Sequence, residues 1–121
     1  MERVYFTERN GRRILVQDLT DSKSVEESIA TFDRTEALIR QEPPQSVRLL
    51  TNVTNAHYTT EAVDRLKRFS RDVTPWIHVS ATVGISGIKR IIVQSLNRLT
   101  GRQIKICDTA DQALDWLARQ E

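Results

Sequence analysis

The spacing of apolar and polar positions changes along the chain between the period of a strand and the period of a helix. Near the N-terminus, Val4 and Phe6 alternate with Tyr5 and Thr7, and a second extended run covers residues 12–18. The dipeptide Asn10-Gly11 between the two runs favours a tight turn with positive φ at both central residues. The pattern therefore predicts a β-hairpin over the first 18 residues.

Four later stretches have apolar residues at helical spacing. They run from about residue 25 to 41, from the Thr59-Thr60-Glu61 cap to just before Thr74, from Ile88 to Gly101, and from the Thr109 cap to about Leu117. Ser24 and Glu27 have the spacing of a capping box, which predicts the first helix start, and Pro43-Pro44 ends that helix. Gly101 stands where a C-terminal glycine cap would lie.

Three short apolar stretches separate these helices and predict strands: Ser46–Asn52, Ile77–Gly84 and Gln103–Cys107. Strict alternation in the second stretch predicts that Ile77, Val79, Ala81 and Val83 share one face, with His78 on the other as a structural or exposed residue. The order β-β-α-β-α-β-α-β-α predicts one layered α/β domain over residues 1–121 with a five-stranded mixed sheet and about four helices. Ligands of such sheets favour the carboxyl ends of strands, near a reversal of strand order.

Length and composition limit the class of protein. A chain of 121 residues has room for one domain and one core, and no apolar run approaches the ~20 residues of a membrane span. A net charge of +2 is too small to predict nucleic-acid binding. The start of the chain does not have the pattern of a signal peptide, and Cys107 is the single cysteine. We therefore expect a cytoplasmic protein with a buried strand thiol at Cys107 and no disulfide.

The strongest local candidate for anion binding is the turn that joins the 77–84 strand to the next helix. Gly84, Ser86 and Gly87 lie at a helix N-terminus, and Lys89 and Arg90 follow directly. Backbone N–H groups, the positive end of the helix and two cations would meet there. The alternative is an ordinary tight turn in which Ser86 caps the helix and both cations face solvent.

The loop after the 46–52 strand is a second candidate. His57 and Asn55 lie in it beside Asn52, Thr54 and Tyr58, so a ligand would meet several hydrogen-bonding groups. The alternative is that these residues serve turn formation alone.

Catalytic and metal-binding patterns are missing from the sequence. The turn at Gly84 lacks the spacing of a nucleotide P-loop, and both histidines precede Ser86, which is the wrong order for a nucleophile elbow. One cysteine and two histidines offer no recognised metal spacing. We expect no enzymatic activity and no cofactor.

Four segments together resemble the SpoIIAA-like family of small bacterial proteins, within the wider STAS and CRAL-TRIO fold group. They are Leu49–Thr54, Val83–Lys89, Leu99–Arg102 and Ala113–Leu117. The resemblance covers nearly the whole chain and implies a bacterial, cytoplasmic α/β domain. The CRAL-TRIO branch implies a small lipid or apolar ligand held between helices and sheet.

The anti-sigma factor antagonists of this group are phosphorylated on a Ser or Thr at a helix start, which implies Thr59 or Thr60 as the matching residue here. Thr-Thr-Glu-Ala-Val stands where an Asp-Ser-Ser-Gly-Leu-Gly kind of motif is expected, so the sequence favours Thr59 or Thr60 as an ordinary N-cap over a phosphorylation site. The leading hypothesis is a regulatory module that contacts an unknown protein partner through the 52–60 loop and Arg68. The alternative is a carrier of a lipid or of a phosphate- or carboxylate-bearing molecule, held by Ser86, Lys89 and Arg90 near His57 and Asn55. A homodimer through an exposed edge strand is a further expectation.

Overall fold

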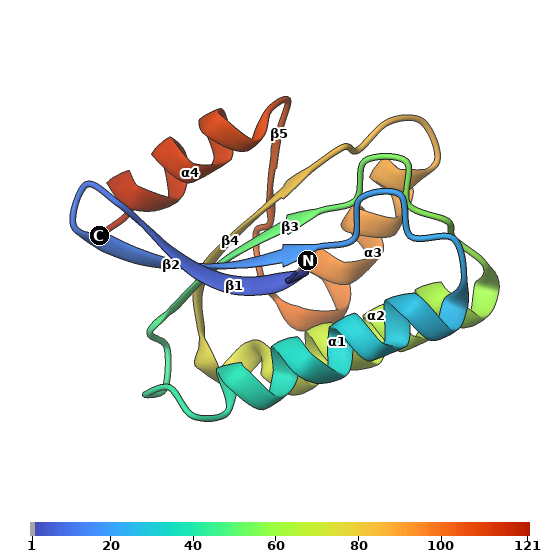
Figure 1. Cartoon of the computed structure of the whole chain (residues 1–121), viewed down its shortest axis with the longest axis horizontal. Coiled ribbons are helices and arrows are strands. Elements are labelled where there is room, and N and C mark those ends of the chain that lie inside the picture. The colour runs from blue at the N-terminus through green and yellow to red at the C-terminus, as the bar shows by residue number, and fades with distance from the viewer. Residues whose placement is uncertain (1) are drawn as a thin grey trace.

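The computed structural model describes residues 2–121 and contains the expected five-stranded mixed sheet with four α-helices (Figure 1). The strands are β1 (Val4–Arg9), β2 (Arg12–Asp18), β3 (Val47–Asn52), β4 (Ile77–Val83) and β5 (Lys105–Cys107). The helices are α1 (Val25–Ile39), α2 (Thr60–Val73), α3 (Lys89–Thr100) and α4 (Ala110–Arg119), and a 3₁₀ turn, Thr74–Trp76, leads into β4. None of the helices among these residues is long and apolar enough to cross a membrane.

The strand order in space equals the order in the sequence, β1-β2-β3-β4-β5. β1 and β2 form the predicted antiparallel hairpin, with positive φ at Asn10 (55°) and Gly11 (78°), and the remaining neighbours are parallel. Because the order never reverses, the sheet has no switch point of the kind that the sequence analysis associated with ligands. A ligand site in this protein therefore cannot depend on a reversal of strand order.

The helices cover the two faces of the sheet unequally. Helices α1, α2 and α3 lie on one face and α4 lies on the other (Figure 1). Right-handed crossovers that all progress in one direction across a sheet place their helices on the same side. Helix α4 follows the last strand and makes no crossover, so it is free to cover the opposite face.

Local sequence signals define the helix ends. Ser24, Thr59 and Thr109 are the N-caps of α1, α2 and α4, and each side-chain oxygen accepts a hydrogen bond, at 3.1–3.2 Å, from the backbone N–H three residues later. Gly101 ends α3 with a left-handed φ of 73°, as predicted. Helix α1 ends at Ile39, two residues earlier than expected, and Arg40 is its C-cap.

Each face of the sheet has its own core. The core on the α1–α3 face is built around Leu15, Leu49, Phe32 and Phe69. The rings of Phe32 and Phe69 stack, with their centroids 5.5 Å apart. The α4 face has a separate cluster, formed by Ile14, Val16, Leu50, Ala81, Val83, Cys107, Ala113 and Leu117. The Cys107 thiol is free and buried, as expected.

One prediction for β4 is wrong. Ile77 packs in the α1–α3 core, whereas Val79 packs against the α4 core, so these two residues do not share a face. Pairing with β3 shifts here, since Val47 pairs with Ile77 and the next residue, Arg48, pairs with Val79. His78 is the extra residue of this irregularity and is exposed. An inserted residue reverses the alternation that the sequence pattern assumes.

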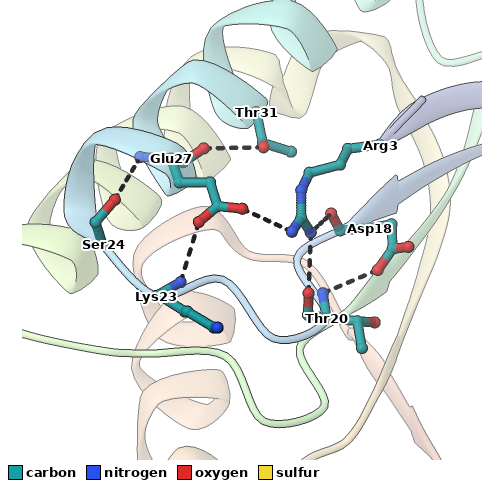
Figure 2. A network of polar contacts seen from close by, with 7 residues as sticks. All are labelled: Arg3, Asp18, Thr20, Lys23, Ser24, Glu27 and Thr31. Atoms are coloured by element: carbon teal, nitrogen blue, oxygen red, sulfur yellow. Dashed lines mark hydrogen bonds and ion pairs between the residues drawn. The ribbon is translucent and has the colours of Figure 1, made fainter. Parts of the chain in front are cut away.

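A polar network joins the N-terminus of the chain to the start of α1 (Figure 2). The Arg3 guanidinium donates to the carbonyls of Asp18 and Thr20, both at 3.0 Å, and to the Glu27 carboxylate at 2.7 Å. The same carboxylate accepts the backbone N–H of Lys23 at 3.1 Å. This backbone hydrogen bond and the charge of Arg3 lower the pKa of Glu27. The network fixes α1 against the end of β2.

Candidate functional site

A cavity of about 90 Å³ lies between the sheet and helices α2 and α3. Small side chains line it where a close-packed layer would need large ones: Thr51, Ser80 and Thr82 from the sheet, and Ala62 and Ser70 from α2. The cavity therefore follows from the sequence of these elements.

The walls of the cavity are otherwise mainly apolar. The aliphatic and aromatic residues that line it are Leu19, Phe32, Leu49, Val53, Ala56, Tyr58, Ala62, Val63, Leu66, Phe69, Ile85, Ile92, Val93, Leu96 and Ile104. Among the lining residues in the described part of the chain, none is Asp or Glu. Lys89 and Arg102 are the charged residues in the lining, and both are cations.

Loops at the carboxyl ends of β2, β3 and β4 form one end of the cavity. His57 and Tyr58 line the cavity and are exposed, and the backbone N–H of His57 donates to the Ser22 carbonyl at 2.7 Å. The Lys89 ammonium donates to the carbonyl of Val53 at 2.9 Å, which ties α3 to the loop after β3. This end is the rim at which a ligand would meet solvent.

Arg102 is the other cation in the lining, and its guanidinium is poorly satisfied. Its Nη1 lies 3.5 Å from Ser80 Oγ and its Nη2 lies 3.5 Å from the Ser70 carbonyl, at the long limit of a hydrogen bond. Its Nε is buried and has no hydrogen-bond partner within the described residues. Burial lowers the pKa of Arg102 to about 10, because the charged form loses hydration that nothing replaces.

The turn after α3 holds Arg102 in this position. Gly101 reverses the chain with its left-handed φ, and the backbone N–H of Arg102 donates to Thr100 Oγ1 at 3.2 Å. Two residues later, the N–H of Ile104 donates to Asn97 Oδ1 at 3.0 Å. Both ends of the turn are thereby fixed to α3, and the arginine side chain is directed back to the sheet beside Ser80.

The structure separates the residues of the predicted anion site into two groups. Lys89 and His57 line the cavity, whereas Ser86, Gly87 and Arg90 are exposed and lie outside its lining. The N–H groups of Lys89 and Arg90 donate to the carbonyls of Ser86 and Gly87, both at 3.1 Å. Ile88 is the N-cap residue of α3 and provides no side-chain cap, so Ser86 does not cap this helix as the alternative supposed.

The structure explains why a glycine occupies position 84. Its φ is 89°, and a Cβ built at this position would lie 2.5 Å from the backbone nitrogen of Thr54. Gly84 therefore allows the loops after β3 and β4 to approach closely. Gly87 also has a positive φ, of 54°, but a Cβ there would meet nothing within 4 Å.

The residues of the other predicted sites lie on the surface around α2. Thr59 Oγ1 accepts from the N–H of Ala62 at 3.1 Å and is thus an N-cap, as one of the two interpretations held. Thr60, the first residue of α2, and Arg68 are exposed. Asn55 is exposed too, with a positive φ of 56°. Asn55, Thr59, Thr60 and Arg68 do not line the cavity.

Sequence reasoning missed Arg102 as a site residue. The available signal was the hydroxyl side chains at Ser80 and Thr82, in a strand with neighbours on both sides. These residues are only 6% and 9% exposed. A strand covered on both faces should be apolar on both faces, so buried Ser and Thr mark a gap in the helix layer.

A comparison with solved structures supports the architecture. No family model and no curated protein matches the sequence. Among solved structures, the chain is similar to an uncharacterized protein from the DUF3478 family with a SpoIIAA-like fold, from Shewanella loihica PV-4, with a TM-score of 0.75. The match covers 94% of this chain and 91% of that chain at 14% identity. The protein therefore has a SpoIIAA-like fold, as the resemblance predicted, and this likeness concerns the fold alone.

Proposed function

We propose that the protein binds a small, largely apolar molecule in the cavity between the sheet and helices α2 and α3. The observation that carries this proposal is an apolar-walled cavity that reaches an exposed rim at His57 and Tyr58. Ligand sites in proteins are typically concave and mainly apolar, with a few polar groups that orient the ligand. Binding of this kind needs no catalytic group, in keeping with the expectation that the protein is not an enzyme.

The hypothesis of a regulatory interaction module has weaker support. Thr59 uses its hydroxyl oxygen in capping α2, which is sufficient reason for a Thr at that position. Thr60 and Arg68 are exposed, as polar residues on the outer face of a helix ordinarily are. The cavity is the feature that fold stability alone does not require, so it carries the proposal.

The proposal can be tested with 1-octanol as an apolar probe and backbone amide NMR shifts as the measurement. We expect saturable shifts that are largest at lining residues such as Val63, Leu66 and Val93. A Val63→Phe substitution should fill part of the cavity and weaken binding about tenfold or more, because a bound apolar group and the new ring need the same space.

Leu114→Phe is the matched control for this test. Leu114 is partly buried, as Val63 is, but lies against the core on the α4 face. This variant should bind octanol as the wild type does. Equal binding by the wild type and Val63→Phe, or shifts centred on the α4 face, would refute the proposed function.

A further inference from the structure

Arg102 is a cation in the wall of a mainly apolar cavity, and no carboxylate of the described residues pairs with it. We propose that the ligand carries a carboxylate at one end and that the Arg102 guanidinium binds this carboxylate. The inference rests on the proposed function and goes beyond it by assigning the chemical class of the ligand and the residue that recognises it. The residue differs from the ones that the sequence favoured, which were Ser86, Lys89 and Arg90.

The first argument is the state of the Arg102 donors. Two other arginines show what a satisfied guanidinium looks like: the Arg65 and Arg34 guanidinium groups lie 2.7 Å from the carboxylates of Asp33 and Glu2. Arg102 instead has two contacts of 3.5 Å and a buried Nε that meets no acceptor among residues 2–121. A buried charge without a partner is unfavourable, and a carboxylate that accepts from two guanidinium N–H groups at once would relieve it.

The second argument is the electrostatics of the surrounding chain. Residues 73–107 contain five Lys or Arg residues and no Asp or Glu. None of the described residues that line the cavity is acidic, so no side chain there competes with an incoming anion. The cavity therefore favours a negative group over a neutral or positive one.

The third argument concerns the amount of negative charge. A carboxylate brings one charge, which the single Arg102 cation neutralises. A phosphate monoester brings ≈ −1.5 to −2 at neutral pH, and the excess charge would be buried against apolar walls. Arg102 also has Ser70 and Ser80 beside it, whose side chains offer hydroxyl groups but no second cation. A carboxylate is the better match.

The fourth argument is the direction of the ligand. Lys89 begins α3 and Arg102 follows its C-cap, so the two cations lie at opposite ends of a 12-residue helix, roughly 18 Å long. The Lys89 ammonium is at the rim and donates to the Val53 carbonyl. A carboxylate at Arg102 would place the apolar part of the ligand along Leu96, Val93 and Ile92, toward the rim.

The test compares three probes with the same eight-carbon tail: octanoate, 1-octanol and octyl phosphate. Binding is measured at neutral pH by calorimetry, and the Nε–Hε signal of Arg102 is followed by NMR. We expect octanoate to bind at least about tenfold more tightly than octanol, as a charge-assisted hydrogen bond provides, and to shift the Arg102 signal. Octyl phosphate should bind more weakly than octanoate.

Arg102→Met leaves an unbranched, neutral side chain that reaches the position of Nε and removes the charge, and should bind octanoate no better than octanol. Arg98→Met is the matched control, because Arg98 is an exposed arginine of α3 outside the cavity lining, and it should keep the wild-type preference. Arg102→Lys retains the charge without the planar fork and should keep only part of that preference. If Arg102→Met does not fold, Arg102→Lys and the Nε–Hε signal of Arg102 in the wild type still decide whether the guanidinium binds the carboxylate.

Three outcomes would overturn the inference. Equal binding of octanoate and octanol by the wild type would leave the cavity as a site for apolar ligands and would show that it does not prefer a carboxylate. Tighter binding of octyl phosphate would assign the site to a phosphate. Loss of the octanoate preference in Lys89→Gln, with Arg102→Met unchanged, would return the anion site to Lys89. Failure of octanol itself to bind would instead refute the proposed function.

Discussion

Arg48 and Arg102 are arginines with buried donors on opposite faces of the same sheet, and they differ in what their donors meet. Arg48 is 8% exposed, and its Nη1 donates to the carbonyls of Leu117 and Gln120 at 2.6 and 2.7 Å. Desolvation, and secondarily the charge of Arg12, lower the pKa of Arg48. Arg102 has only contacts of 3.5 Å and an unpartnered Nε. Both arginines are desolvated, but only Arg48 is satisfied by the fold.

The same contrast holds for the two layers that contain these arginines. On the α4 face, Ala81, Ala113 and Leu117 have no measurable exposure. On the α1–α3 face, Ser80 and Thr82 line a cavity instead. The α4 face is therefore close-packed at these residues. The α1–α3 face instead contains the space in which we propose that a ligand binds. The two arginines therefore differ in how well their polar groups are satisfied more than in whether they are desolvated.

The largest expected effect is that of Arg48→Met. The substitution leaves the carbonyl of Leu117 without its charged donor and weakens the end of α4, so we expect the free energy of unfolding to fall by about 2–4 kcal/mol. Arg102→Met removes a charge that is not satisfied and should change stability by less than about 1 kcal/mol. Urea unfolding of both variants measures the difference. Equal losses would mean that Arg102 is as structural as Arg48.

A smaller effect separates two adjacent residues of β4 that face opposite layers. Ala81→Val adds volume to the filled α4 core and should cost about 1–3 kcal/mol through overpacking. Ser80→Val adds volume inside the cavity, so we expect little loss of stability and weaker binding of octanol. Thermal unfolding and the octanol titration provide the two readouts. A large loss of stability in Ser80→Val would show that the space beside Ser80 is too small for a ligand.

Much of the fold could be predicted because local chemistry determines it. Asn10-Gly11 defines the hairpin, and Ser24, Thr59 and Thr109 define helix starts through hydrogen bonds within four residues. The face of Ile77 could not be predicted, since the irregularity at His78 arises from pairing with β3, which is distant in the sequence. The SpoIIAA-like fold itself followed from the order of elements and the quoted segments.

The candidate site could be predicted only in part. Lys89 and His57 were singled out from the loops at the carboxyl ends of strands, and both line the cavity. Arg102 follows a helix C-cap and has no motif around it, so its burial depends on Ser70 and Ser80 from two other elements. A cavity is a property of packing among several elements, and the spacing of residues within one segment does not show it.

The smallest expected effect concerns Glu27, whose carboxylate connects α1 to Arg3 (Figure 2). Its pKa is lowered in the folded state, first by the Lys23 N–H and then by Arg3. The carboxylate therefore stabilises the fold at pH values above its unfolded pKa, and this contribution is lost as the pH falls through the folded pKa. Glu27→Gln should lower the melting temperature slightly at pH 7, and this difference should shrink as the pH falls below the unfolded pKa of about 4.3 and vanish below the folded pKa. Glu26→Gln, an exposed neighbour in the same helical turn, is the control and should have a weaker effect at pH 7. A Glu27→Gln difference that persists unchanged to pH 3 would show that the glutamate acts through packing and not through its charge.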